Sequence, residues 1–238
     1  MDNIITIFKK EFKTFFVSPI AYIFIVVYLV VTNFLFFQSF FLINQADMRS
    51  YFGLLPWIFL LFVPAITMRS WAEEKKLKTL ELLLTWPISD FQVVAGKFLA
   101  SFSFLAITIL LSISVPITVS LLGSPDPGPI FGGYIGALLM GAAYLAIGLW
   151  ISSFTENQIV AFILGVVITF ALFIVGNPFV TMAAPSMLVP VLNYIGLGNH
   201  FQSIERGVID TRDILYYVSV VGFFLFLNVQ TLGSRKWE

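Results

Sequence analysis

The chain has 238 residues, of which 59% are hydrophobic and only 11% are charged, and its mean hydropathy is +0.96. Soluble domains contain about 25% charged residues, so this composition excludes a soluble domain and indicates a membrane protein whose apolar excess faces lipid. The formal net charge of zero gives no indication of a nucleic-acid partner, and the lack of cysteine excludes disulfides, cysteine-ligated metals and thiol catalysis.

Residues 4–17 predict an amphipathic helix that lies in the headgroup region of the membrane. Charged side chains between positions 9 and 13 occupy one part of its surface, and the apolar face consists of Ile5, Phe8, Phe12 and Phe15. Ser18-Pro19 then ends the helix. This helix is either an elbow that transmits movement or a simple anchor.

Six apolar runs are long enough to cross about 30 Å of hydrocarbon, which takes about 20 helical residues. They cover Ile20–Ile43, Phe52–Trp71, Phe98–Leu122, Ile130–Ser152, Ile159–Phe179 and Ile214–Leu232. Because the runs are continuous rather than alternating, they predict helices and not the strands of a barrel. The predicted fold class is all-α: one polytopic transmembrane domain over residues 1–238 with about six transmembrane helices.

The lysine and arginine residues predict the orientation of these spans. With six spans, all 13 of them except Arg49, Arg206 and Arg212 fall on one side of the membrane. An excess of basic residues marks the cytoplasmic side, so we expect both termini in the cytoplasm. A seventh full span would place the C-terminal basic residues outside, which argues against it.

The segment from Arg69 to Ala100, between the second and third spans, is the most informative part of the sequence. Residues 73–86 are good helix formers, and Pro87 ends this short helix. Its stripe of leucines is apolar, and Glu74 lies four residues before Lys78 in a favourable pair. The helix is either a connector that rests on the membrane or a docking element for a soluble partner. Beyond it, a capping box that begins the next helix is predicted at Ser89 and Gln92.

Two glycines in the fourth span, Gly132 and Gly136, form a GxxxG pair. Such a pair allows another helix to approach closely. It serves packing inside a chain more often than a dimer interface, so we assign these residues to helix packing.

The predicted extracytoplasmic loop covers residues 180–212. Its first part, Val180–Leu197, is apolar but contains two prolines, Asn193 and one glycine, and a second glycine follows it directly. This part is therefore either a re-entrant or interfacial piece or a broken seventh span.

The second part of this loop is amphipathic and leads into the last span, which Asp210-Thr211 would cap. We interpret it either as an external gate or contact for an extracytoplasmic partner, or as a solvated loop with a capped helix. His200 is the only histidine and makes a poor metal site alone, so neither a metal site nor a catalytic residue is predicted. The candidate gate residues are Phe201, Glu205, Arg206 and Asp210.

The loop between the second and third spans resembles the signature of the ABC-2 family of ATP-binding-cassette transporter permeases. The matching residues are Arg69, Glu74-Lys75-Lys76, Thr79-Leu80-Glu81-Leu82-Leu83, Pro87-Ile88-Ser89 and Gly96-Lys97. Lys78 stands where the family usually has glycine, which predicts a helix that continues without a soft point. The resemblance extends over nearly the whole chain, and residues 200–210 resemble the gliding-motility and nitrous-oxide-reductase accessory permease group.

This resemblance implies that residues 73–86 form a coupling helix, which in the family sits in a groove of a separate ATPase subunit. The charged members of the set would contact the ATPase and the leucines would seat the helix. The implied docking residues are Glu73, Glu74, Lys75, Lys76, Leu77, Lys78, Leu80, Glu81 and Leu84.

The resemblance also implies a function: a permease subunit that forms the translocation path of an exporter in the bacterial cytoplasmic (inner) membrane. Its partners would be an ABC ATPase subunit, which binds ATP-Mg, and a second copy or a related permease. Gly96-Lys97 lacks the glycine five residues earlier that a phosphate-binding loop needs, so we expect neither enzyme activity nor a cofactor in this chain. The alternative is a non-transporting membrane scaffold or a subunit that transmits mechanical work to an extracytoplasmic partner.

Overall fold

The computed structural model describes residues 2–43, 45–80 and 87–234. The chain is 82% helical, and the described residues form no strands. Within the described ranges, five helical stretches are long and apolar enough to cross a membrane, which confirms an all-α polytopic membrane fold; they are Pro19–Leu42, Arg49–Lys76, Asp90–Leu122, Pro127–Ser152 and Thr211–Ser234.

The predicted spans correspond to helices whose ends follow local sequence signals. Ser89 begins α6 with the predicted capping box, in which its hydroxyl accepts from the Gln92 backbone. Two short breaks follow Leu111 and Thr67, so that the third span is α6 with α7 and the second is α3 continued by α4. The bounds are α2 (Pro19–Ile43), α3 (Arg49–Thr67), α4 (Ala72–Lys76), α6 (Asp90–Leu111), α7 (Ser114–Leu122), α8 (Pro127–Ser152) and α13 (Thr211–Ser234).

The fifth predicted span is shorter than expected. It forms α9 (Gln158–Ile174), which has 17 residues, whereas the sequence predicted helix as far as Phe179. The helix ends because Asn177 begins a new helix: its side-chain oxygen accepts from the Phe179 backbone, and Pro178 takes the first helical position.

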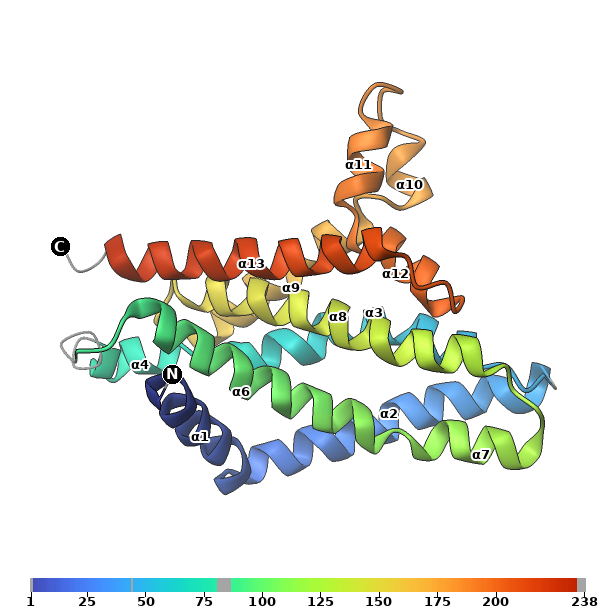
Figure 1. Cartoon of the computed structure of the whole chain (residues 1–238), viewed down its shortest axis with the longest axis horizontal. Helices are drawn as coiled ribbons and strands as arrows, with labels where there is room; N and C mark the ends of the chain where they lie inside the picture. Colours follow the sequence, from blue (N-terminus) through green and yellow to red (C-terminus); the bar gives the residue numbers. More distant parts are fainter. Residues whose placement is uncertain (1, 44, 81–86, 235–238) are drawn as a thin grey trace.

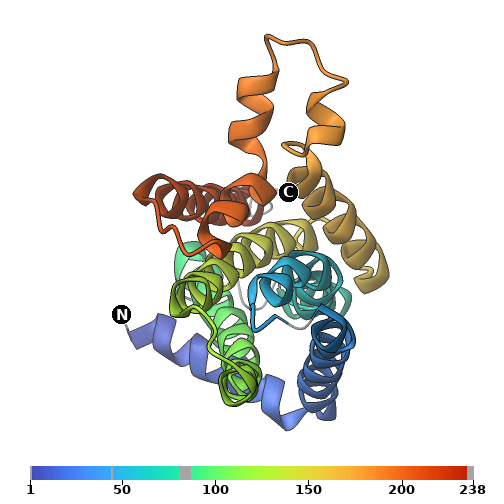
Figure 2. The same cartoon turned by 90° about the vertical axis from the view of Figure 1, so that its right-hand side faces the viewer.

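Helix α8 occupies the centre of the bundle (Figure 2), and 78% of its apolar 18-residue stretch is buried. Small residues allow neighbouring helices to approach it closely. A Cβ on Gly148 would lie 2.2 Å from Thr67 Oγ1 of α3, and one on Gly141 would lie 2.5 Å from Leu105 of α6. In contrast, only 22% of the corresponding 18-residue stretch of α2 is buried, so most of the apolar surface of α2 faces outward.

Helix α1 (Asp2–Val17) crosses the bundle obliquely and leads into α2 at the predicted Ser18-Pro19 break (Figure 1). Phe15 stacks on Phe104 of α6, with 5.0 Å between the ring centroids, so part of the predicted apolar face packs against protein. Ile5 remains 49% exposed on the same helix.

The segment after α9 forms α10 (Pro178–Thr181), α11 (Val189–Ile195) and α12 (Leu197–Glu205). Helices α10 and α11 stand away from the bundle as a hairpin, and neither contains a buried residue (Figures 1 and 2). With 4 and 7 residues, neither helix is long enough to span a membrane by itself, and both interpretations of this segment stay predictions.

Candidate functional site

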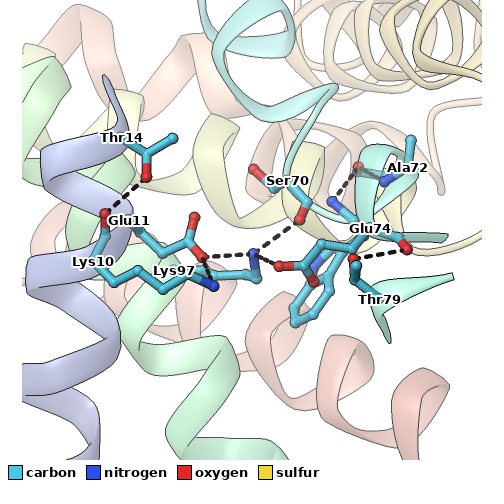
Figure 3. Close-up of polar contacts among 10 residues, drawn as sticks. Lys10, Glu11, Thr14, Ser70, Ala72, Glu74, Thr79 and Lys97 are labelled. Atoms are coloured by element: carbon cyan, nitrogen blue, oxygen red, sulfur yellow. Dashed lines mark hydrogen bonds and ion pairs between the residues drawn. The ribbon is translucent and has the colours of Figure 1, made fainter. Parts of the chain in front are cut away.

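A buried lysine joins three elements at one end of the bundle (Figure 3). The Nζ of Lys97, on α6, lies 2.7 Å from Oε1 of Glu74 on α4 and 3.1 Å from Oε1 of Glu11 on α1. The same ammonium group donates a hydrogen bond of 3.0 Å to the backbone carbonyl of Ser70. We call these four residues the Lys97 junction.

The junction depends on Lys97 for its charge balance. The side chain of Lys97 is 3% exposed, and those of Glu11 and Glu74 are 21% and 18% exposed. Taking such charges out of water is unfavourable unless they are paired. The acceptors from Glu11, Glu74 and Ser70 match the three hydrogens of the ammonium group. The Nζ of Lys97 also lies 4.9 Å from the centre of the Trp71 ring.

Gly96 explains how α1 reaches this lysine. A Cβ at position 96 would lie 2.7 Å from Cγ2 and 2.8 Å from Cβ of Ile7, distances shorter than any normal contact. Ile7 in turn belongs to a small buried cluster with Trp71, Leu80 and Val93. The adjacent Gly96 and Lys97 therefore have complementary roles: the glycine admits α1, and the lysine pairs with its glutamate.

Helix α4 is also fixed to the end of α8. The hydroxyl oxygen of Ser152 accepts hydrogen bonds from the backbone nitrogens of Trp71 and Ala72, at 3.1 and 3.3 Å. Lys75, which is 7% exposed, donates from its Nζ to the backbone carbonyl of Ser153. Two faces of this short helix are thus held within the chain, one by α8 and one by the Lys97 junction.

The continuous helix predicted over residues 73–86 is wrong in its described part. Helix α4 ends at Lys76, and Lys78 adopts a left-handed conformation with φ of 55°. This is the position after the C-cap, where a left-handed residue ends many helices and glycine is preferred. The turn forms despite the lysine side chain, so the expected helix without a soft point is not observed. Residues 81–86 lie outside the described part.

Comparison with known families identifies the chain. The sequence profile of the family described as ABC-2 family transporter protein matches residues 8–227. The chain belongs to the ABC-2 transporter family. It is therefore a multi-pass membrane permease subunit of an ABC transporter, and in this family ATP is generally hydrolysed by a separate ATPase subunit. No curated protein matches the chain.

The predicted docking residues of this permease divide between two faces of the loop. Glu74, Lys75 and Leu80 point inward; the predicted pairing of Glu74 with Lys78 is wrong, because its partner is Lys97. Glu81 and Leu84 lie outside the described residues. The docking role of the whole set stays a prediction. The members exposed to the surroundings are Glu73, Lys76, Leu77 and Lys78.

The glycine pair of the permease lies beneath α12. A Cβ on Gly132 would lie 2.5 Å from the backbone oxygen of Ile204, and one on Gly136 would lie 3.1 Å from the ring of Phe201. The close approach that the GxxxG pattern predicts is thus made inside the chain. Among the candidate gate residues, Phe201 is a core side chain at 1% exposure and does not face an opening.

The other candidate gate residues do not gather into one cluster. Asp210 caps α13, since its Oδ1 accepts from the Arg212 backbone at 2.9 Å, as predicted. Arg206 is exposed, and Glu205 is half-buried near the start of α3. Burial raises the pKa of Glu205, although the nearby Arg206 and Arg49 act in the opposite direction.

Sequence reasoning missed a second polar cluster, which ties the hairpin to α13. His200 Nδ1 lies 2.7 Å from Oδ1 of Asp213, and its Nε2 lies 3.0 Å from the backbone oxygen of Tyr194. The imidazole also stacks on Tyr216, with 3.8 Å between the centroids. Asp213 lies in the first turn of α13, where the helix dipole favours a carboxylate in any case, so its position in the sequence does not point to a contact with His200.

Proposed function

We propose that this permease couples a separate ATPase to the membrane domain through α4, and that two such chains, or this chain and a related permease, form the translocation path of an exporter. The Lys97 junction carries this proposal. Its buried charges connect the loop that faces the proposed ATPase to α1 and to α6 at once. A displacement of α4 would therefore move both helices instead of being lost in a flexible connector.

The exposed surface of the same loop supports a docking role. Leu77 is 63% exposed beside the charged side chains of Glu73 and Lys76. A single exposed leucine is ordinary on a protein surface, so its docking role rests on its place in the loop that resembles the coupling helix of the family. The inward face is occupied by Lys97 and Ser153, so only the outward face is available to a soluble partner.

The proposed orientation places α1, α4 and the end of α13 in the cytoplasm. These elements lie at one end of the bundle, and α12 lies toward the other (Figure 1). The native chain lacks cysteine, so single cysteines at Lys9 and Val208 can be labelled in intact bacterial cells with a membrane-impermeant maleimide. Labelling at position 208 alone is expected; labelling at position 9 alone would reverse the orientation.

The docking proposal is tested with matched substitutions. Leu77→Asp should abolish co-purification of the ATPase encoded with this permease, because it places a charge in the contact surface. Val208→Asp, at a residue of the same exposure (62% against 63%), should leave co-purification unchanged. Equal ATPase recovery from both variants would exclude docking through this loop. Glu73→Lys provides a second test that leaves the Lys97 junction intact.

The alternative, a scaffold or a subunit that transmits mechanical work to an extracytoplasmic partner, is favoured by the resemblance of residues 200–210 to the gliding-motility group. The purified complex distinguishes the two. Stimulation of ATP hydrolysis by a transported substrate or lipid supports export, whereas stimulation only by an extracytoplasmic protein supports mechanical transmission.

A further inference from the structure

A cavity of about 1010 Å³ lies between α1, α3 and α6, directly beside the Lys97 junction. This volume is at the upper end of the range for small-molecule sites, about 300–1,000 Å³. Helix α1 lines it with Asn3, Thr6, Lys10 and Thr14, so the helix turns its polar side chains toward the cavity. Polar groups of α1 beside the charges of the Lys97 junction can hold the polar part of a ligand.

The lining contains both charged and apolar side chains. Lys10, Arg69 and Glu73 are exposed and charged and adjoin Glu11, Ser70 and Glu74 of the junction in sequence; we call this the polar end of the cavity. Phe24, Ile66 and Phe104 are apolar and come from three different spans, and Phe104 lies two helical turns, about 10 Å, beyond Lys97 on α6. An amphiphile, with a charged head and an apolar tail, fits this division better than a wholly polar solute.

The charges at the polar end are balanced in number. The cavity is lined by three basic residues (Lys10, Arg69 and Lys97) and three acidic residues (Glu11, Glu73 and Glu74). Lys97 pairs with both carboxylates of the junction, and Glu11 also lies 3.9 Å from Nζ of the exposed Lys10. Arg69 and Glu73 form no ion pair among the residues that the structure describes. A guanidinium group binds phosphate well, and a carboxylate binds an ammonium group.

We propose that this cavity binds one phospholipid whose headgroup carries both a phosphate and an amine. The phosphate lies between Arg69 and Lys10, the amine faces Glu73, and an acyl chain follows Phe24, Ile66 and Phe104. The amphipathic α1 places the polar end at the level of the lipid headgroups. The cavity shares Glu73 and Leu77 with the proposed docking surface, but lipid binding needs only a membrane-embedded chain and can be measured without an ATPase.

Native mass spectrometry of the delipidated, full-length chain in detergent tests the proposal. The chain is titrated with dioleoyl-phosphatidylethanolamine, with dioleoyl-phosphatidylglycerol and with inorganic phosphate. We expect one phosphatidylethanolamine per chain, bound about tenfold more tightly than phosphatidylglycerol, and no displacement by inorganic phosphate. Equal affinity for the two lipids would contradict the proposed contact between the amine and Glu73. Displacement of the lipid by inorganic phosphate would show that the cavity binds phosphate and not a lipid.

Two pairs of variants locate the site. Lys10→Gln with Arg69→Gln should weaken phosphatidylethanolamine binding by about tenfold or more, whereas Lys9→Gln with Lys13→Gln, which removes the same charge from the same end of the chain, should not. Equal affinity in the two double variants would place the lipid elsewhere.

Filling the cavity provides the second pair. Ala65→Trp places a large side chain in the lining and should abolish the bound lipid, whereas Ile163→Trp, at a residue that is 53% exposed on α9, should leave it unchanged. Size-exclusion profiles of both variants control for folding. Full lipid binding by a folded Ala65→Trp chain would contradict the site.

Discussion

The two ends of the bundle are held by different interactions. At the Lys97 junction, opposite charges from α1, α4 and α6 are buried together, so the three elements are tied into one unit. At the other end, the hairpin of α10 and α11 (residues 178–195) contains no Asp, Glu, Lys or Arg, and it exposes apolar side chains such as Met182 and Met187, at 86% and 88%. The first end suits the transfer of force, and the second suits an apolar environment.

Among the changes that test this difference between the two ends, removal of the Lys97 ammonium group should have the largest effect. Lys97→Met leaves Glu74 without its cation and Glu11 with only the exposed Lys10, 3.9 Å away, which should destabilise the chain by about 3 kcal/mol. Thermal unfolding in detergent measures the loss, and limited proteolysis should show α1 released first. Lys13→Met, on the exposed side of α1, is the control. If both variants unfold at the same temperature, the junction does not hold the elements together.

The close contact of α1 with α6 should be the next most sensitive feature. Gly96→Ala forces Ile7 away and should cost about 1–3 kcal/mol of stability. Combining it with Ile7→Ala should recover part of the loss, because the added methyl group then occupies the space of the removed side chain. Gly222→Ala on α13 meets nothing within 4 Å and should be neutral or slightly stabilising. A neutral Gly96→Ala variant would mean that α1 is loosely attached.

The contrast between these positions also shows what the sequence can predict. Helix ends were predictable where the signal is local, as at Ser18-Pro19, at the Ser89 capping box and at Asp210. The ion pair between Glu11 and Lys97 joins residues 86 positions apart, and no local pattern encodes it. The basic residue was recognised as part of a motif, but its partners depend on how α1 folds back onto α6.

Local patterns also misassigned Glu74 and Lys78. The i,i+4 rule describes an isolated helix surface, where an exposed pair contributes only about 0.2–0.5 kcal/mol. A buried lysine that needs acceptors competes strongly for the same carboxylate, and the helix ends before Lys78. The tertiary contact therefore overrides the local one.

At the outer end, His200 should have an intermediate effect. Its two ring nitrogens face oxygen atoms of Asp213 and Tyr194. His200→Ala removes both contacts and also the stacking of the imidazole on Tyr216. We expect the local stability of the hairpin and α12 to fall by about 1–3 kcal/mol, with no change elsewhere. Hydrogen exchange of residues 189–205 measures it, with the exposed Gln202→Ala as control. Protection lost equally near Lys97 would show that the two ends are not independent.

The turn after α4 should respond in the opposite direction. Lys78→Gly relieves a left-handed lysine and should stabilise the turn by about 1 kcal/mol. Hydrogen exchange at residues 72–80 is expected to slow in this variant, while Lys76→Gly, inside the helix, should accelerate it. Faster exchange in Lys78→Gly would mean that the lysine side chain itself supports the turn.

The smallest effect is expected at Glu205, a half-buried carboxylate at the outer end. Burial raises its pKa above the ordinary value of an exposed glutamate, so the folded chain holds the proton more tightly than the unfolded chain. Stability is then greatest below that value and decreases as the pH rises through the folded pKa. Glu205→Gln, which keeps a neutral side chain, should have a slightly higher melting temperature than wild type at pH 7.5 and the same one at pH 4. The exposed Glu156→Gln should show no such difference. A wild type that is the more stable at pH 7.5 would mean that Arg206 and Arg49 outweigh burial, and that the outer end also depends on paired charges.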